Sequence, residues 1–292
     1  MLLWTFRRNE NDVVNLYDSL SPIMQLSTDG DMLNFGYWDN STDKPVEAQK
    51  NLCDFTGKLS NLSNAKSLVD VGSGMLGPAR KWQLDYPDLE ISSININYNQ
   101  LKNSNTDFIQ KINSTSRFLP FGDSTIDRII ALESAQHFKP LEDFLLESKR
   151  ILKDDGNLVI AVPVVSKNAS VITDLGILSF TWSSEHYTIE SITSKINSVG
   201  LSIIQSQKIG HNVYTPLAQY YFANRKKLQE RIRTKYSSTT EKILCKSLEK
   251  IIRIFNNFAT KYMIIEIIPE TINKEQLINI IEKYNWKLFK SL

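Results

Sequence analysis

The chain is poor in the residues that build disulfide-linked and metal-bound folds. Its 292 residues include two cysteines, Cys53 and Cys245, and three histidines, His137, His186 and His211. Two cysteines cannot form a disulfide framework, and they are too few for a zinc site with four thiolate ligands. The histidines lie far apart in the sequence. We therefore expect no metal site, and an intracellular, cofactor-using protein is the simplest interpretation.

Long apolar runs are also missing. The longest, such as Tyr262–Ile268, are too short and too interrupted to span a bilayer. The first eight residues lack the charged region and the cleavage site of a secretory signal, so we expect a cytoplasmic location. With 41% apolar and 23% charged residues, the composition excludes wholesale disorder and a collagen-like structure.

The chain does contain a regular alternation of strand and helix patterns from residue 66 onward. Short β-type runs predict strands at Lys66–Val71, Leu89–Ile96, Ile126–Leu132, Asn157–Val164, Leu201–Lys208 and Tyr262–Ile268. Helical patterns begin near Gly77 and cover Tyr98–Ile112, Pro140–Leu152 and Thr188–Val199. This alternation predicts an α/β fold with a mostly parallel sheet that helices cover on both faces.

The segment after Gly210 departs from this alternation. Its patterning is helical, and residues 241–258 carry apolar side chains on one face and lysines on another. His211–Lys261 contains eleven Lys or Arg and three Glu, a local net charge of +8, whereas the whole chain has +2. A last helix is predicted at Asn273–Tyr284. We expect one domain, with an N-terminal helical cap over 1–62, a cofactor-binding core over 63–210, a helical lid insertion over 211–260, and a last strand and helix over 261–292.

The clearest motif is a glycine-rich turn after the first predicted strand. Gly72, Gly74 and Gly77 have the spacing G-x-G-x-x-G, and a helix follows. Glycines permit a sharp turn and a close approach of the backbone to a ligand, and a helix N-terminus offers N–H groups to an anionic group. Nicotinamide and flavin enzymes share this spacing. Asp70, two residues before the first glycine, instead favours a ligand with a positive amino group, because a pyrophosphate would gain nothing from an anion there.

Val69–Ala79 resembles the first motif, D-x-G-x-G-x-x-G, of class I S-adenosylmethionine-dependent methyltransferases. Ser93–Leu101 and Phe118–Asp127 are similar to further stretches of this family, and Leu33–Asn40 and Ala131–Phe138 are similar to stretches of its subgroup that acts on sugars, polyketides, sterols and prenyl chains. The resemblance covers roughly residues 13–268. It implies a doubly wound, Rossmann-like sheet of seven strands, N-terminal helices, a helical lid insertion before the last strand, and S-adenosyl-L-methionine as the cofactor.

The resemblance also implies the residues that bind the cofactor. Its methionine end would contact the first motif, at Asp70, Gly72, Ser73, Gly74 and Gly77. The family usually has an acid at the end of the second strand that binds both ribose hydroxyls. Here Asn95 and Ile96 occupy that place, so the ribose contact would be shared with Asn97 or Gln100. The adenine position, commonly Asp followed by a small residue, falls on Thr115 and Ser116.

His137 is the candidate general base. It follows a strand's carboxyl end, where open α/β sheets build their sites, and its ordinary pKa of about 6.5 lets it accept a hydroxyl proton. A structural histidine is the alternative interpretation. Related sugar O-methyltransferases often have an orienting acid after the fifth strand, but this sequence has none at residues 161–164. Either another group orients His137, or the reaction needs no strong base. Glu133 is interpreted as a structural or cofactor-side residue.

Three aromatic residues are candidates for the reaction centre. Tyr37 and Trp38 are expected to cap it and exclude water. Tyr17 resembles the tyrosine of the N-terminal helix that reaches the cofactor's carboxylate in relatives. The apolar face of the lid would line a pocket for a small-molecule or lipid-like substrate. Its basic face is either solvated or docks on an anionic membrane surface. Nucleic-acid binding is not expected, because no recognisable binding motif is present.

The main functional hypothesis is methyl transfer to a small molecule, most plausibly to a hydroxyl. Carbon methylation of an isoprenoid or sterol-like lipid is the nearest alternative, because it would use the same cofactor motifs. A nicotinamide oxidoreductase is an alternative of another class, against which Asp70 and the stretch Leu119–Asp127 argue. A catalytically inactive binding protein with a methyltransferase fold is the remaining alternative, since Asn95 and Thr115 depart from the family pattern.

Overall fold

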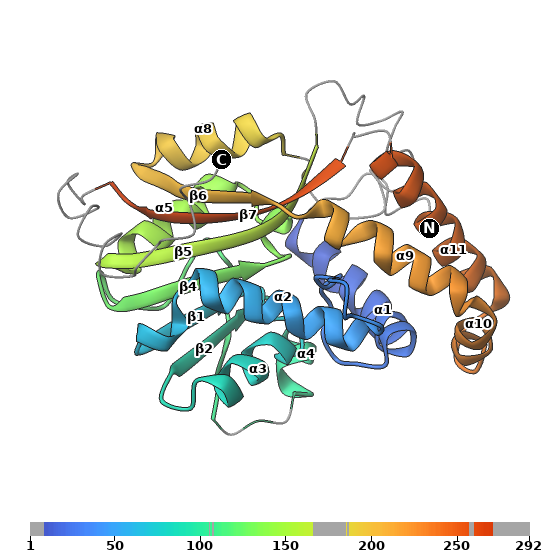
Figure 1. The fold of residues 1–292 in the computed structure, drawn as a ribbon. Helices are drawn as coiled ribbons and strands as arrows, with labels where there is room; N and C mark the ends of the chain where they lie inside the picture. Colours follow the sequence, from blue (N-terminus) through green and yellow to red (C-terminus); the bar gives the residue numbers. More distant parts are fainter. Residues whose placement is uncertain are drawn as a thin grey trace.

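The computed structural model describes residues 9–104, 106, 108–165, 185, 187–256 and 260–270. One twisted sheet with helices on both faces forms the body of the molecule, and a separate group of helices lies at one end of it (Figure 1). The helix predicted at Asn273–Tyr284 lies outside the described residues. Within the described part of the chain, no helix is long and apolar enough to cross a membrane, and no cluster of three His, Cys, Asp or Glu side chains could hold a metal ion.

The sheet contains seven strands in the order β3-β2-β1-β4-β5-β7-β6. Only β7 is antiparallel to its neighbours, β5 and β6. This arrangement confirms the predicted doubly wound, mostly parallel sheet. The strands are β1 (Ser67–Val71), β2 (Glu90–Asn95), β3 (Gln110–Asn113), β4 (Ile126–Leu132), β5 (Leu152–Val165), β6 (Leu201–Lys208) and β7 (Thr260–Pro269).

Each face of the sheet has its own apolar core. Helices α2 (Pro45–Leu59), α3 (Gly77–Asp85) and α4 (Tyr98–Lys102) cover one face, where Leu52 and Trp82 are fully buried. Helices α5 (Leu141–Ile151) and α8 (Ile189–Ser198) cover the other, where Phe144 and Ile196 are fully buried. Because both faces are covered, the central strands are apolar on both sides, as parallel sheets require. Short 3₁₀ turns occupy Leu62–Asn64, Ala135–His137 and Gly210–Asn212.

The helices at the end of the sheet come from two distant parts of the sequence. Helix α1 (Glu10–Thr28) is N-terminal, whereas α9 (Tyr214–Ala223), α10 (Arg225–Arg233) and α11 (Ser238–Asn256) lie between β6 and β7. The latter three confirm the helical insertion before the last strand, and we call them the lid. A small core that includes Tyr221, Leu228 and Leu248 holds the lid together. Arg231 ties α10 to α1, since it donates to the carbonyl of Leu26 at 3.3 Å.

One predicted element is wrong. The helix expected over Tyr98–Ile112 ends at Lys102, and Gln110–Asn113 forms strand β3, which pairs with β2. β3 is an edge strand of four residues, in which Gln110, Lys111 and Asn113 are exposed and only Ile112 packs against the core. An exposed edge strand needs no alternation of apolar and polar residues, so the sequence carried no strand signal there. The other predicted strands and helices match within a few residues, except that β5 already begins at Leu152.

Candidate functional site

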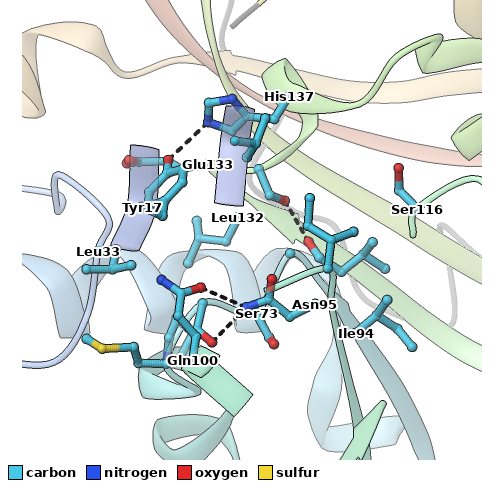
Figure 2. A pocket seen from close by; sticks show the side chains of 18 of the residues that line it. Tyr17, Leu33, Ser73, Ile94, Asn95, Gln100, Ser116, Leu132, Glu133 and His137 are labelled. Carbon is cyan, nitrogen blue, oxygen red and sulfur yellow. Dashed lines mark hydrogen bonds between the residues drawn. The ribbon is translucent and has the colours of Figure 1, made fainter. Parts of the chain in front are cut away.

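A cavity of about 860 Å³ lies beyond the carboxyl ends of β1, β2 and β4. The strand order reverses between β1 and β4, and ligands of open α/β sheets bind at such a point. Val71, Asn95 and Leu132, the last residues of these three strands, line the cavity. Figure 2 shows it from close by. We call it the strand-end cavity.

The glycine-rich turn forms the floor of the strand-end cavity. Gly72 has φ of 79° and Gly74 has φ of 55°, a backbone region that favours glycine. A Cβ atom on Gly72 would lie 2.3 Å from the Cβ of Ser134, so no larger residue fits. The backbone N–H groups of Gly72 and Ser73 both donate to the carbonyl of Ile94, which fixes the turn against β2. The hydroxyl of Ser73 is buried and has no partner among the described residues.

The charge of the lining indicates the kind of ligand that fits. The described residues that line the strand-end cavity include three carboxylates, Glu10, Asp31 and Glu133, and no Lys or Arg. Two of these carboxylates form ion pairs with Arg80 and Arg117, which do not line the cavity. A diphosphate would find no cation here. A ligand with positive sulfonium and amino groups fits the acidic lining and the unpaired Ser73 hydroxyl.

Asn95 lies at the centre of an amide network. Its Nδ2 donates to the carbonyl of Gly74 at 3.0 Å and to Oε1 of Gln100 at 2.9 Å. Its Oδ1 accepts from the backbone N–H of Asn97. Gln100 in turn donates to the hydroxyl of Ser21 on α1 at 2.9 Å. The backbone groups on both sides fix the orientation of the Asn95 amide, and its donors are used within the protein (Figure 2).

The two residues at the predicted adenine position lie in different environments. Ser116 is buried and lines the strand-end cavity, whereas Thr115 does not line it and donates to Oε1 of Glu10 at 2.5 Å. Glu10 lies in the first turn of α1 and lines the cavity itself. Thr115 therefore holds the start of α1 against the cavity rather than forming its wall.

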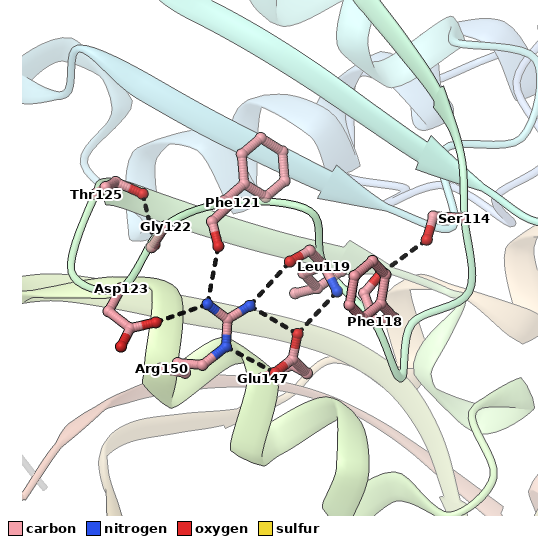
Figure 3. Close-up of polar contacts among 9 residues, drawn as sticks. All are labelled: Ser114, Phe118, Leu119, Phe121, Gly122, Asp123, Thr125, Glu147 and Arg150. Carbon is pink, nitrogen blue, oxygen red and sulfur yellow. Dashed lines mark hydrogen bonds and ion pairs between the residues drawn. The ribbon is translucent and has the colours of Figure 1, made fainter.

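The loop after β3 is held by helix α5 (Figure 3). Arg150 donates to the carbonyls of Leu119 and Phe121 at 2.9 and 2.8 Å, and Glu147 accepts from the backbone N–H of Leu119. The hydrogen bond from Arg150 lowers the pKa of Glu147 below its usual value. These contacts give a structural role to the family-like stretch Phe118–Asp127, because they fix the loop that carries Ser116.

Two predicted cofactor residues lie behind the cavity. Asp70 is buried in β1 and does not line the cavity, and its Oδ2 has no partner within the described part of the chain. Burial raises the pKa of Asp70 to about 7. Gly77 begins α3, where a Cβ atom would lie 2.6 Å from Cγ of Met32. Gly77 thus permits the close packing of α3 against the segment after α1.

A second cavity of about 1060 Å³ adjoins the first. Its walls are apolar side chains from α1 and from the lid, among them Leu20, Ile23, Met24, Leu217, Leu228 and Leu248. We call it the lid cavity. Among the described residues, five line both cavities and mark their junction: Tyr17, Leu33, Asn34, Glu133 and His137.

His137 and Tyr17 form a polar pair at this junction. The Tyr17 hydroxyl lies 3.0 Å from Nε2 of His137, and the rings meet edge to face with centroids 5.4 Å apart. Burial, and secondarily the carboxyl of Glu133, raise the pKa of Tyr17 well above its usual value. Tyr17 is therefore a neutral phenol whose hydroxyl lies within hydrogen-bond distance of Nε2 of His137. α1 supplies Tyr17, and the turn after β4 supplies His137 (Figure 2).

Glu133 is a buried carboxyl at the same junction. It accepts hydrogen bonds from the backbone N–H of Phe35 and from the hydroxyl of Tyr262, both at 3.0 Å. Its backbone has φ of 53°, which is unusual for a residue other than glycine. Burial raises the pKa of Glu133 to about 8. A cation at the junction would favour the ionised form of this carboxyl.

Comparison with known proteins agrees with this geometry. Residues 69–160 match the methyltransferase domain family. This chain therefore contains a methyltransferase domain over these residues. The matched stretch begins in β1, ends in β5 and includes the glycine-rich turn, Asn95, Glu133 and His137.

Relatives of this methyltransferase domain are known in sequence and in structure. The chain is 28% identical over 166 residues to erythromycin 3''-O-methyltransferase of Saccharopolyspora erythraea, an alignment covering 54% of each protein. It is 26% identical over 159 residues to 27-O-demethylrifamycin SV methyltransferase of Amycolatopsis mediterranei, covering 51% of this chain and 57% of that one. The alignments thus span little more than half of these relatives. The cyclopropane synthase MmaA2 of Mycobacterium tuberculosis has the same fold, with a TM-score of 0.75, 16% identity, and coverage of 90% and 99%.

Tyr37 and Trp38 line neither cavity of the methyltransferase domain. The ring of Tyr37 stacks on Phe55, and Trp38 packs against Tyr220 of the lid. Trp38 also exchanges two hydrogen bonds of 2.7 Å with Asn212. In this structure Trp38 joins the N-terminal segment to the base of the lid, and Tyr37 packs on α2.

The structure adds residues that the sequence analysis did not single out. Asn34 lies at the junction, and Gln136 lines the lid cavity. Both could have been predicted from the sequence, since they belong to the stretches Leu33–Asn40 and Ala131–Phe138 that resemble the family. The remaining predicted residues, Gly72, Ser73, Gly74, Asn95, Ile96, Gln100, Ser116, Glu133, Tyr17 and His137, come together around the strand-end cavity.

Proposed function

We propose that this protein transfers a methyl group from S-adenosylmethionine to a hydroxyl of a neutral, largely apolar small molecule. The observation that carries the proposal is the junction itself. A cavity with an acidic lining at the glycine-rich turn meets an apolar cavity at Tyr17, Glu133 and His137. One of the two relatives named above is called an O-methyltransferase, and the other is named after an O-demethyl substrate. Both names support oxygen as the acceptor atom.

The cofactor would occupy the strand-end cavity. The turn at Gly72–Gly74 and the Ser73 hydroxyl would hold its methionine end, and Ser116 lies where its base would reach. When bound, S-adenosylmethionine supplies a methyl group that its sulfonium already activates. The protein's own contribution is therefore alignment of the acceptor and removal of its proton.

Tyr17 and His137 would remove that proton together. In this proposal His137 is neutral and its Nε2, 3.0 Å from the Tyr17 hydroxyl, accepts the phenol hydrogen, so the phenol oxygen keeps a lone pair for the hydrogen of an acceptor hydroxyl. The acceptor proton would pass to the Tyr17 oxygen as the phenol proton passes to His137. The acceptor oxygen would then receive the methyl group as the bond from that carbon to the cofactor's sulfur breaks, and His137 would finish as an imidazolium near Glu133.

Methylation of an alkene carbon is the second candidate. The buried Glu133 favours it, because a carboxylate at the junction could stabilise a carbocation or accept its proton after methyl transfer. The two candidates differ in their need for His137. An alkene has no hydroxyl proton to remove before the attack, so His137→Ala would leave the methylation step of carbon chemistry intact.

A peripheral membrane contact through the basic lid is part of the proposal only for a lipid acceptor. Lys226, Lys227, Arg233 and Lys235 are exposed on α10 and directly after it. Phosphatidylglycerol vesicles should then pellet the protein at low salt and release it at 0.5 M salt, a concentration at which charge attraction is screened over about 4 Å. Equal pelleting with phosphatidylcholine vesicles would contradict a role for these charges.

Calorimetry with three ligands tests the proposal. S-adenosylmethionine and S-adenosylhomocysteine should bind with one site each, and NAD should show no heat of binding. Mass spectrometry of small molecules that co-purify with the protein should then identify an acceptor, and its mass should rise by one methylene on turnover. Binding of NAD in place of S-adenosylmethionine would overturn the proposal, and cofactor binding without any turnover would favour an inactive binding protein.

A further inference from the structure

Gln136 presents an unsatisfied acceptor beside the proposed reaction centre. The side chain lines the lid cavity and is 6% exposed, and its Oε1 has no hydrogen-bond partner among the described residues. Its Nε2 donates to the carbonyl of Glu133 at 2.7 Å. That bond fixes which end of the amide is the oxygen, because a carbonyl must face the NH₂ group.

Asn34 repeats this pattern at the junction. It is 4% exposed, lines both cavities, and its Oδ1 is likewise buried without a partner in the described part of the chain. Its own carbonyl accepts a hydrogen bond of 2.8 Å from Gln49 on α2, which holds the Asn34 backbone in place. Three amide oxygens of side chains that line the lid cavity, those of Gln136, Asn34 and Gln49, therefore lack donors among the described residues.

Other polar side chains of the lid cavity do not supply these donors. The hydroxyls of Ser27 and Thr28 donate to carbonyls within α1, at 2.8 and 2.9 Å. Among the described residues that line the lid cavity, none is Lys or Arg. A buried amide oxygen without a donor costs free energy, so a ligand that provides one gains affinity over a ligand that does not.

We propose that Gln136 and Asn34 recognise a second hydroxyl on the acceptor, next to the one that is methylated. The acceptor is then a neutral, mostly apolar diol rather than a simple alcohol or an anionic lipid. The apolar part would lie against the leucines of α1 and the lid, and the proton of the second hydroxyl would be shared in a bifurcated hydrogen bond between Oε1 of Gln136 and Oδ1 of Asn34. This inference rests on the proposed function, which places the first hydroxyl beside Tyr17 and His137.

Three small probes with a common alkyl chain test the inference. We would measure binding of 1,2-octanediol, 1-octanol and octyl phosphate by calorimetry to the full chain, with and without S-adenosylhomocysteine. A hydrogen bond to an otherwise unsatisfied acceptor predicts that the diol binds about fivefold more tightly than the alcohol. The phosphate should bind more weakly than both, because the cavity offers its charge no cation.

Two variants and one control assign the preference to residues. In Gln136→Met and in Asn34→Leu, the ratio of the two affinities should fall to within about twofold of unity. Ser27→Ala is the matched control, since its hydroxyl lines the same cavity but is satisfied within α1, and it should keep the wild-type ratio. A thermal melt would show whether either variant fails to fold. If one does, the other still tests the inference.

The inference and the proposed function fail in different ways. Equal binding of diol and alcohol by the wild-type protein, or an unchanged ratio in both variants, would overturn the diol inference while cofactor binding persisted. Tighter binding of octyl phosphate than of the diol would also overturn it. Absence of S-adenosylhomocysteine binding would instead remove the proposed function, and the ratio measured without cofactor would still stand as a property of the lid cavity.

Discussion

The two cavities differ in how the protein builds them. The strand-end cavity is made by consecutive residues at the ends of β1, β2 and β4, and backbone groups and amides dominate its floor. The lid cavity is made by apolar side chains from α1 and α9–α11, which are about two hundred residues apart in the sequence. The first is fixed by local motifs, and the second by packing between distant segments. Changes to the first should therefore act on the cofactor, and changes to the second on the acceptor.

Gly72→Val should have the largest effect. The new side chain would overlap Ser134, and the backbone at φ of 79° disfavours a β-branched residue. We expect no detectable binding of S-adenosylmethionine by calorimetry. A thermal melt controls for folding, and octanediol binding in the lid cavity should survive. Retained cofactor affinity in a folded variant would mean that the cofactor does not contact this turn.

His137→Ala should lower turnover by about 10²–10⁴-fold for a hydroxyl acceptor, because a general base acts in the transition state. The Michaelis constant of the acceptor should change far less. Tyr17→Phe should reduce turnover in the same direction, since the phenol oxygen is the contact to the acceptor. Tyr98→Phe, on an exposed tyrosine of α4, is the control. Wild-type turnover in His137→Ala would make His137 structural and favour carbon methylation.

Asn95→Asp tests two opposite predictions of cofactor affinity, one made from the sequence and one made from the structure. A carboxylate is the family's usual residue here, so the sequence alone predicts preserved or tighter cofactor binding. In the structure, however, Nδ2 donates to Gly74 and Gln100, and a carboxylate oxygen would face both acceptors. We now expect about tenfold weaker binding of S-adenosylmethionine, as for the loss of one to two hydrogen bonds. Unchanged or tighter binding would show that the network rearranges around a ribose contact.

The stability of the protein should fall as pH rises. Burial raises the pKa of Asp70 from 3.8 to about 7, and those of Glu133 and Glu266 from 4.5 to about 8. Between these values the native state holds protons that the unfolded chain releases, so unfolding becomes easier with rising pH. The melting temperature should decline from pH 5 to pH 8 and level off above it. Glu133→Gln should make the decline shallower, and a melting temperature that rises over this range would contradict the assignment.

The sequence predicted the features that depend on local motifs and missed those that depend on packing between distant segments. The glycine-rich turn, Asn95 and His137 were found because each lies in a short motif at a strand end, where local spacing determines position. Strand β3 was missed because an exposed edge strand carries no apolar pattern. The pairing of Tyr17 with His137, across 120 residues, depends on how α1 packs and has no local signal. The positions of Tyr37 and Trp38 behind the lid depend on Phe55 and Tyr220 in the same way.

The smallest predicted effect concerns Glu241, which fixes the shape of the lid. Its side chain is fully buried and accepts hydrogen bonds from Tyr221, Arg225 and Gln229, so that it links α9, α10 and α11. Glu241→Gln keeps the volume but loses the charge, and its NH₂ group would face the donor of Gln229 in place of Oε2, or those of Tyr221 and Arg225 in place of Oε1. The lid walls at Leu228 and Leu248 would then be held less firmly.

We expect Glu241→Gln to raise the Michaelis constant of the acceptor by about two- to fivefold, as for weakening of one charged hydrogen bond, and to leave the affinity for S-adenosylmethionine unchanged. The ratio of 1,2-octanediol to 1-octanol binding should also persist, because Gln136 and Asn34 lie outside the lid. A raised Michaelis constant with an unchanged binding ratio would separate the role of the apolar lid wall from that of Gln136 and Asn34. A parallel loss of cofactor affinity would show that the lid and the strand-end cavity are coupled through α1, which α10 contacts, and the two cavities would then behave as one site.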